Sequence, residues 1–184
     1  MPKYEGPQQQ QSTVDTAVRK TTLLLSSAGQ RLIRPEADGV RELLSDAFGI
    51  TAKALADGSA RGPIATIKNV LARISSYMLG STLKYVAKPP SAASQFACYT
   101  IPSTGRAEVF LTPKFFSGGY STVELAAYLV HEYVHLVHWP NGHPGASGEQ
   151  LAVLFDRCPL EIPPAQSVNN AYCYQYFIEW LADL

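Results

Sequence analysis

The sequence has little charge, few cysteines and no long apolar run. Charged residues make up 16% of the 184 residues, against roughly 25% in an average soluble domain. The 15 basic side chains balance 15 acidic ones, and no basic cluster is present, which excludes the electrostatic footprint of a nucleic-acid-binding protein. The longest apolar run, Leu125 to Val130, is far shorter than the roughly 20 residues that cross a bilayer, so no membrane span is expected.

Neither the cysteines nor the N-terminus indicates a cellular compartment. The three cysteines, Cys98, Cys158 and Cys173, are irregularly spaced and form no Cys-x-x-Cys pair, which argues against a zinc ribbon or a redox pair. One disulfide with one free thiol, or three buried thiols, both fit this number. The first residues are polar and lack the apolar core of a signal peptide, so retention in the cell, export without a leader and removal of a leader all stay open.

The composition that remains is typical of one folded domain. Hydrophobic residues make up 46% of the chain and aromatic residues 10%, which excludes a disordered protein. At this length a single domain can bury a sizeable core without disulfides or structural metals. Residues 1–12 are polar and are expected to form a flexible tail, so the single domain is expected to span residues 13–184.

Apolar residues repeat at helical spacing through the first 80 residues. The pattern predicts helices over residues 13–33, 35–48 and 63–79. Pro35 suits the first turn of the second helix and Gly49 suits its end, because proline fits helix starts and glycine readily adopts the left-handed conformation after a last turn. Each predicted helix has one apolar face, which we interpret as a core face.

Short β-type runs and further helices follow. The expected strands are Leu83–Val86, Phe96–Ile101 and Ala107–Leu111, of which the last two are expected to pair as a hairpin. Further helices are expected over residues 121–138, near 149–157 and from Ser167 to the end. Ser121 and Glu124 form a capping-box pattern at the start of the first of these. Helices, a small sheet and more helices, in that order, predict an α+β fold.

All four histidines lie between positions 131 and 143, and two of them belong to the motif His131-Glu132-Tyr133-Val134-His135. Because residues four apart share one helix face, the imidazoles of His131 and His135 can converge on one zinc ion at about 2.0–2.1 Å. Glu132 lies about 100° round the helix, where it can take a proton from a metal-activated water and return it to a leaving amine. The motif on a capped helix therefore predicts a zinc site with Glu132 as general base.

A catalytic zinc needs a third protein ligand, which the motif itself does not supply. His138 lies a full turn beyond His135 and is too far along the helix to close the site. The remaining candidates are His143 and Glu149, with Asp156 and Glu161 behind them. The metzincin class is excluded, because its extended motif needs Gly and His where this sequence has His138 and Asn141.

Two further segments carry a family resemblance. Residues 165–177, which contain Asn170-Ala171-Tyr172, resemble the Asn-Ala-Asp-x-Tyr-x-x-Phe block of the deuterolysin-like zinc peptidases, or aspzincins, which include the lysine-specific metallo-endopeptidases. Residues 107–116, which end in Pro-Lys-Phe-Phe, are similar to the strand and turn that precede the motif helix in that family. The resemblance implies a zincin-like single domain of the α+β class, with N-terminal helices, a small mostly antiparallel sheet, the motif helix and C-terminal helices.

The resemblance also implies the third zinc ligand. Aspzincins take this ligand from a Gly-Thr-x-Asp segment, which aligns with Ala146–Glu149 when counted back from Asn170. Glu149 then stands in place of the family's aspartate, and a His₂Glu set is a known ligand set for catalytic zinc. The expected metal ligands are therefore His131, His135 and Glu149.

The sequence departs from the family at the tyrosine expected on the oxyanion side. That position falls near Ala152, and Tyr172 stands where the family has the aspartate of Asn-Ala-Asp. The resemblance is therefore distant, and the lysine specificity of some members does not carry over. One of Tyr172, Tyr174 and Tyr176 can supply a hydroxyl, whereas aromatic core packing is expected for at least two of them.

These observations predict a zinc-dependent endopeptidase that acts on a protein or peptide substrate. The strand from Arg106 to Thr112 is expected to be the sheet edge along which an extended substrate lies. We expect a secreted or exported enzyme or a toxin or effector domain, for which an inhibitor or immunity protein is an open partner. Two alternatives are a non-catalytic metal-binding interaction module and a zinc amidase that acts on a cell-wall polymer.

Overall fold

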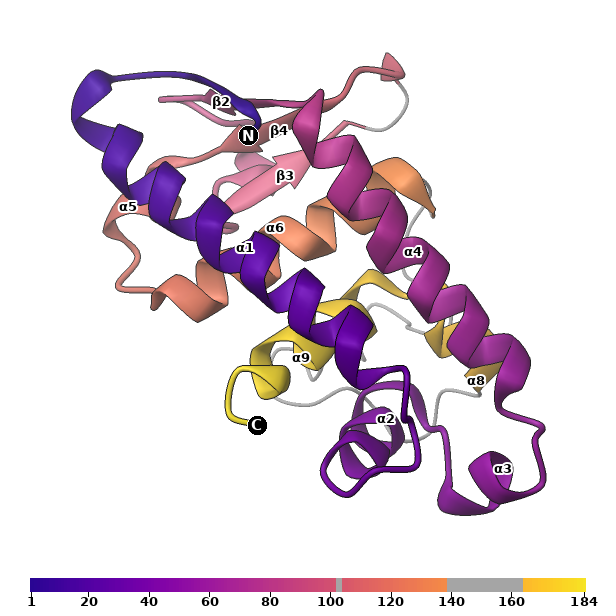
Figure 1. The fold of residues 1–184 in the computed structure, drawn as a ribbon. Coiled ribbons are helices and arrows are strands. Elements are labelled where there is room, and N and C mark those ends of the chain that lie inside the picture. Colours follow the sequence, from indigo (N-terminus) through magenta and orange to yellow (C-terminus); the bar gives the residue numbers. More distant parts are fainter. Residues whose placement is uncertain (102–103, 139–163) are drawn as a thin grey trace.

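The computed structural model describes residues 1–101, 104–138 and 164–184 (Figure 1). The elements up to residue 80 are β1 (Lys3–Glu5), the short 3-10 helix η1 (Gln8–Gln10), α1 (Gln11–Arg31), α2 (Val40–Phe48), α3 (Ala52–Ala56) and α4 (Arg61–Leu79). The elements after residue 80 are β2 (Thr82–Tyr85), the 3-10 helix η2 (Ser91–Ala93), β3 (Cys98–Thr100), β4 (Glu108–Leu111), α5 (Pro113–Ser117), α6 (Thr122–Val137), α8 (Pro164–Ser167) and α9 (Ala171–Leu181). The helix expected near 149–157 lies outside the described residues.

The helix α6 is the centre of the molecule. It contacts α1, α4 and α9 as well as strands β3 and β4, and the small sheet lies at the end of the helical layer opposite to α2 and α3 (Figure 1). Most of its side chains are buried, which explains why its sequence is apolar nearly all round. None of the described helices has the length and the apolar character needed to cross a membrane.

The sheet has the strand order β1-β2-β4-β3. β3 and β4 pair antiparallel, with Tyr99 opposite Phe110 and their rings stacked at 5.1 Å, which confirms the expected hairpin. β1 pairs parallel with β2, and β2 pairs parallel with β4. The expectation of a mostly antiparallel sheet is therefore wrong, because two of the three pairings join strands that helices or a long connection separate, and such crossovers allow parallel pairing.

The N-terminal residues do not form the expected flexible tail. Lys3–Glu5 is a strand at one edge of the sheet, where the Lys3 backbone N–H donates to the Ser81 carbonyl at 2.9 Å. The Tyr4 hydroxyl donates to Gln10 Oε1 at 2.9 Å. An edge strand needs only its backbone groups to pair, so the polar composition that suggested a tail did not prevent it from joining the sheet.

Two helix starts also differ from the expectation. Pro35 lies in a turn, and α2 begins at Val40 after Gly39, whose φ of 77° favours glycine. Gly49 ends this helix with a φ of 67°, as predicted. The last long helix begins after Asn170, whose side chain accepts from the Tyr172 backbone N–H at 3.0 Å.

Ser167 has a different role from the predicted helix cap. Its hydroxyl donates to the Phe48 carbonyl at 2.7 Å and so connects α8 to the end of α2. The capping box at the start of α6 is present as predicted: Ser121 Oγ accepts from the Glu124 backbone N–H, and the Glu124 side chain accepts from the Ser121 backbone N–H.

Candidate metal centre

The two motif histidines of α6 point their ring nitrogens at each other. Nε2 of His131 lies 3.2 Å from Nε2 of His135, and the two residues are only 7% and 8% exposed. Two nitrogens that bind one zinc at about 2.0–2.1 Å in a tetrahedral arrangement lie about 3.3–3.4 Å apart. A hydrogen bond between the rings gives a similar distance, but the separation also fits two ligands of one ion. The pair therefore has the geometry of half a zinc site.

The third ligand is not among the described residues. No cluster of three or more His, Cys, Asp or Glu side chains that could hold a metal occurs within residues 1–101, 104–138 and 164–184. His143, Glu149, Asp156 and Glu161 all lie outside these ranges, so Glu149 stays a prediction. His138 is placed away from the pair, with Nε2 2.7 Å from Asn169 Oδ1.

Glu132 points towards the sheet, where its Oε2 accepts a hydrogen bond of 2.9 Å from the Thr100 hydroxyl. Although the residue keeps some exposed surface, protein surrounds its carboxyl group. This burial raises the pKa of Glu132 to about 8, while hydrogen bonds from the Thr100 side chain and backbone act to lower it. A buried carboxylate with raised basicity suits the role of a general base. Thr100 belongs to no recognisable sequence motif, so the sequence alone did not indicate its contact with Glu132.

Tyr172 is the tyrosine that the structure brings to the site. Its ring meets that of His131 edge to face, with centroids 4.5 Å apart and planes at 67°. Burial and the charge of Glu132 both raise the pKa of the Tyr172 phenol. The hydroxyl of Tyr174 instead donates to the Val168 carbonyl at 2.8 Å, and Tyr176 stacks on Trp180. All three tyrosines are buried in the core, in agreement with the expectation of at least two, and the ring of Tyr172 also meets His131.

The cysteines of the described residues do not extend the site. Cys98 on β3 and Cys173 on α9 are both buried, and Cys158 lies outside the described residues. Burial, together with the charge of Glu132, raises the pKa of the Cys98 thiol well above its ordinary value. A protonated thiol is a poor metal ligand, so we interpret Cys98 as a core residue and not as a metal ligand.

A buried serine fixes α6 against the rest of the fold. The hydroxyl of Ser81 donates to the Met78 carbonyl at 2.9 Å and lies 2.6 Å from the Tyr133 hydroxyl. Because the single Ser81 proton is used on Met78, the Tyr133 hydroxyl donates to Ser81 Oγ. Tyr133 is fully buried. This contact joins the middle of the motif to the start of β2 and sets the rotation of the helix that carries the histidines.

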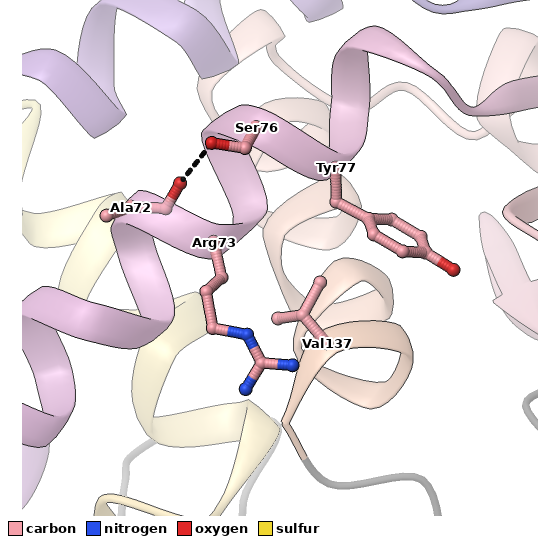
Figure 2. Close-up of a pocket in the computed structure, with 5 residues that line it drawn as sticks. All are labelled: Ala72, Arg73, Ser76, Tyr77 and Val137. Carbon is pink, nitrogen blue, oxygen red and sulfur yellow. Dashed lines mark hydrogen bonds between the residues drawn. The ribbon is translucent and has the colours of Figure 1, made fainter.

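An open groove of about 420 Å³ lies elsewhere, between α4 and the end of α6 (Figure 2). Its lining residues are Ala72, Arg73, Ser76, Tyr77 and Val137. Val137 comes two residues after His135 and therefore lies about 200° round the helix from it. The Ser76 hydroxyl is already used on the Ala72 carbonyl within α4. The groove is thus separate from the metal centre.

Comparison with known proteins identifies a solved structure of similar fold. No protein-family model matches the sequence, and no curated protein matches it. Among solved structures the chain is similar to a zinc peptidase from Grifola frondosa, with a TM-score of 0.69 and 18% sequence identity over 95% of this chain and 96% of that chain. Identity this low establishes the fold alone. The predicted resemblance is therefore confirmed at the level of the fold: this chain has the α+β fold of a zinc peptidase.

Proposed function

We propose that the protein is a zinc-dependent endopeptidase that hydrolyses peptide bonds of a protein substrate. The observation that carries the proposal is the 3.2 Å separation of the His131 and His135 Nε2 atoms on a helix that also carries Glu132. The likeness of the whole chain to a zinc peptidase supports both the metal and the reaction class. Without the histidine geometry, the fold alone would support neither.

The ligand set proposed for zinc is His131 and His135, through Nε2, and Glu149. Two buried imidazoles and one carboxylate are a suitable donor set for zinc and leave a position open for chemistry. When bound, zinc lowers the pKa of a water molecule and polarises the substrate carbonyl. The assignment of Glu149 rests on the sequence resemblance described above.

Glu132 is proposed as the group that moves the proton. Its carboxylate accepts a proton from the attacking water and then gives it to the nitrogen of the amine that leaves, so one group serves both steps. The burial that raises its pKa to about 8 makes the carboxylate a stronger base than a solvated one. A bound cation acts in the opposite direction and keeps the carboxylate ionised.

Tyr172 is proposed as a hydrogen-bond donor to the oxygen that gains negative charge in the transition state. It lies against the His131 ring, and its phenol is close enough to Glu132 for that charge to raise its pKa. Both causes of the raised pKa keep the phenol protonated, and only a protonated phenol can donate. Tyr172 would thus replace the tyrosine that the sequence lacks near Ala152.

The substrate strand is proposed to pair with β3. The expectation that residues 106–112 form the sheet edge is wrong, since β4 lies between β2 and β3. The Thr112 backbone N–H donates to the Ala97 carbonyl at 3.0 Å, and bonding in an antiparallel pair alternates, so the backbone groups of Cys98 and Thr100 face away from β4. The Thr100 N–H is already used on Glu132, and an extended peptide can add to the remaining outward-facing groups of this edge.

The test is hydrolysis by the zinc-loaded full chain. We expect it to cleave a denatured protein at internal bonds, observed by mass spectrometry, and to lose this activity with a chelator and regain it with zinc. Purified cell-wall polymer, offered in parallel, distinguishes a zinc amidase, which would release fragments from the polymer and leave the protein intact. Stoichiometric zinc binding with no hydrolysis of either material would favour the interaction module and contradict the proposal.

A further inference from the structure

The contact between Glu132 and β3 joins two elements that are far apart in the sequence. Thr100 is the last residue of β3 and Glu132 lies in the middle of α6, 32 residues later. The Thr100 hydroxyl lies 2.9 Å from Glu132 Oε2. Because an ionised carboxylate can only accept, the hydroxyl is the donor, and a charged acceptor makes the bond stronger than a neutral one.

Within the described chain, Thr100 holds this carboxylate with its hydroxyl and with its backbone N–H. The ion pairs within that part of the chain are Lys3 with Glu5 and Arg41 with Asp38, so no lysine or arginine there pairs with Glu132. A glutamate side chain loses considerable rotational freedom when it is fixed in one conformation. A carboxylate that is buried without a partner is also costly. The hydroxyl of Thr100 meets both requirements together with the backbone N–H of the same residue.

We propose that Thr100 is a positioning residue for Glu132, a role that rests on the function proposed above. Its hydroxyl holds Oε2 and so fixes the direction of the carboxylate relative to the reacting water. Thr100 itself takes no part in the proton transfer. The bond is useful because proton transfer depends on placement of the base within hydrogen-bond reach of its proton.

The strand is a firm support for this bond although it is only three residues long. Cross-strand stacking of Tyr99 on Phe110 fixes β3 to β4, and Thr100 is in register with Val109, which is fully buried. Threonine is β-branched, so few side-chain rotamers are open to it in a strand. The hydroxyl therefore has a defined position relative to the sheet.

Thr100 would also fix the position of the substrate strand relative to Glu132. The Thr100 carbonyl faces the open side of β3, where an extended substrate is proposed to pair, while its hydroxyl and backbone N–H hold Glu132. A substrate strand placed by β3 is then placed relative to the Glu132 carboxylate as well. This arrangement predicts that loss of the hydroxyl lowers the rate of the bound complex more than it weakens substrate binding.

The first test is kinetic and uses Thr100→Val, which keeps the shape of the side chain and removes the donor. We expect kcat to fall about 10-fold, the scale of one hydrogen bond to a charged group, with KM changed less than about twofold. Thr100→Ser keeps the hydroxyl and should return kcat to within about threefold of the parent. Thr82→Val is the matched control and should change neither constant, because Thr82 lies on β2, which β4 separates from β3.

The second test does not depend on activity. Crystal structures of the metal-free parent and of the metal-free Thr100→Val variant should show the Glu132 carboxylate at residue 100 in the parent and turned away, or in several conformers, in the variant. Zinc binding should be equal in the two proteins.

Three outcomes would overturn the role of Thr100: an unchanged kcat for Thr100→Val, a Glu132 carboxylate that stays in place in that variant, or a serine variant as slow as the valine variant. An inactive parent in which the carboxylate still turns away in Thr100→Val would instead contradict the proposed function and leave the contact intact.

Discussion

The two faces of α6 both bury polar groups, and they do so in different ways. On the face that carries Tyr133, the buried hydroxyl donates to Ser81, whose own proton goes to the Met78 carbonyl, so this polar network closes on itself. On the face that carries His131 and His135, two buried imidazoles direct their Nε2 atoms to one place, 3.2 Å apart. The first arrangement fixes the position of the helix. The second brings two ring nitrogens close enough to bind the same ion.

This difference separates a structural from a functional use of buried polarity. A buried group that only has to be satisfied needs one good partner, and Tyr133 has one. Two imidazoles directed at one another and a nearby buried carboxyl group with a raised pKa on the same helix are costly to bury. Their cost is explained if a cation binds between them, and the following experiments address this explanation.

The largest effect is expected from His135→Ala. Removal of one of two imidazole ligands should weaken zinc binding by more than about 100-fold, since even outer groups around a metal change its affinity by 10- to 100-fold. Elemental analysis of dialysed protein measures the zinc bound per chain. The control is His138→Ala, whose imidazole contacts Asn169 and should be dispensable for zinc. Equal loss of zinc in both variants would show that the ligand face of α6 has been assigned wrongly.

Glu149→Ala tests whether a residue outside α6 supplies the third zinc ligand. If Glu149 is the third ligand, the variant should bind zinc at least 10-fold more weakly than the parent, because two histidines then hold the ion alone. Zinc affinity, titrated against a chromogenic chelator, gives the comparison. His143→Ala is the companion variant. Zinc loss in that variant, with parent affinity in Glu149→Ala, would contradict the assignment drawn from the aspzincin resemblance.

Glu132→Gln should remove turnover and leave zinc in place. The amide has nearly the shape of the carboxyl group but cannot accept the proton, so kcat should fall about 100-fold or more. Glu124→Gln on the same helix is the matched control, because glutamine can also complete a capping box and the start of α6 should be unaffected. Peptide cleavage at the parent rate by Glu132→Gln would assign the base to another residue.

Tyr172→Phe should slow turnover by roughly 100-fold, the lower end of the range for a lost oxyanion donor. Steady-state kinetics at saturating substrate measures the loss, and zinc content should not change. Tyr174→Phe removes a phenol two residues away on the same helix, one that donates to the Val168 carbonyl, and should lower stability without slowing turnover. If the two variants exchange these effects, Tyr172 is a core residue.

The smallest effect on catalysis is expected from a substitution on the face of α6 that carries Tyr133. Tyr133→Phe removes the hydrogen bond to Ser81 and should lower the free energy of unfolding by about 1 kcal/mol, the typical contribution of one neutral bond. Urea unfolding measures this change, and turnover should stay within about twofold of the parent. A large loss of turnover with unchanged stability would mean that the two faces of α6 are not independent.

Local patterns were sufficient to predict the motif helix. The capping box of Ser121 and Glu124 and the spacing of His131 and His135 depend on residues within one or two turns, and the structure has both features. The same holds for the hairpin of β3 and β4, whose strands are neighbours in the chain.

Contacts between distant segments could not be predicted in this way. Nothing near Thr100 in the sequence distinguishes it from other threonines, and its partner Glu132 is 32 residues away. Tyr172 and Tyr174 lie on one short helix, and only packing decides which of them faces His131. The strand Lys3–Glu5 has no apolar pattern because it lies at the sheet edge, so its pairing was missed as well.

The parallel pairing of β1 with β2 has a consequence for how the protein folds. Lys3 pairs with Thr82, and Thr82 pairs in turn with Glu108, so the sheet needs segments that are separated by the whole run of N-terminal helices. Contacts at such sequence separation form slowly, because the intervening chain must be ordered before they can contribute. We expect the helices and the local hairpin of β3 and β4 to form first and the pairing of β1 last. The edge that closes last is then the one opposite β3, so Thr100 can meet Glu132 before the N-terminal strand joins the sheet.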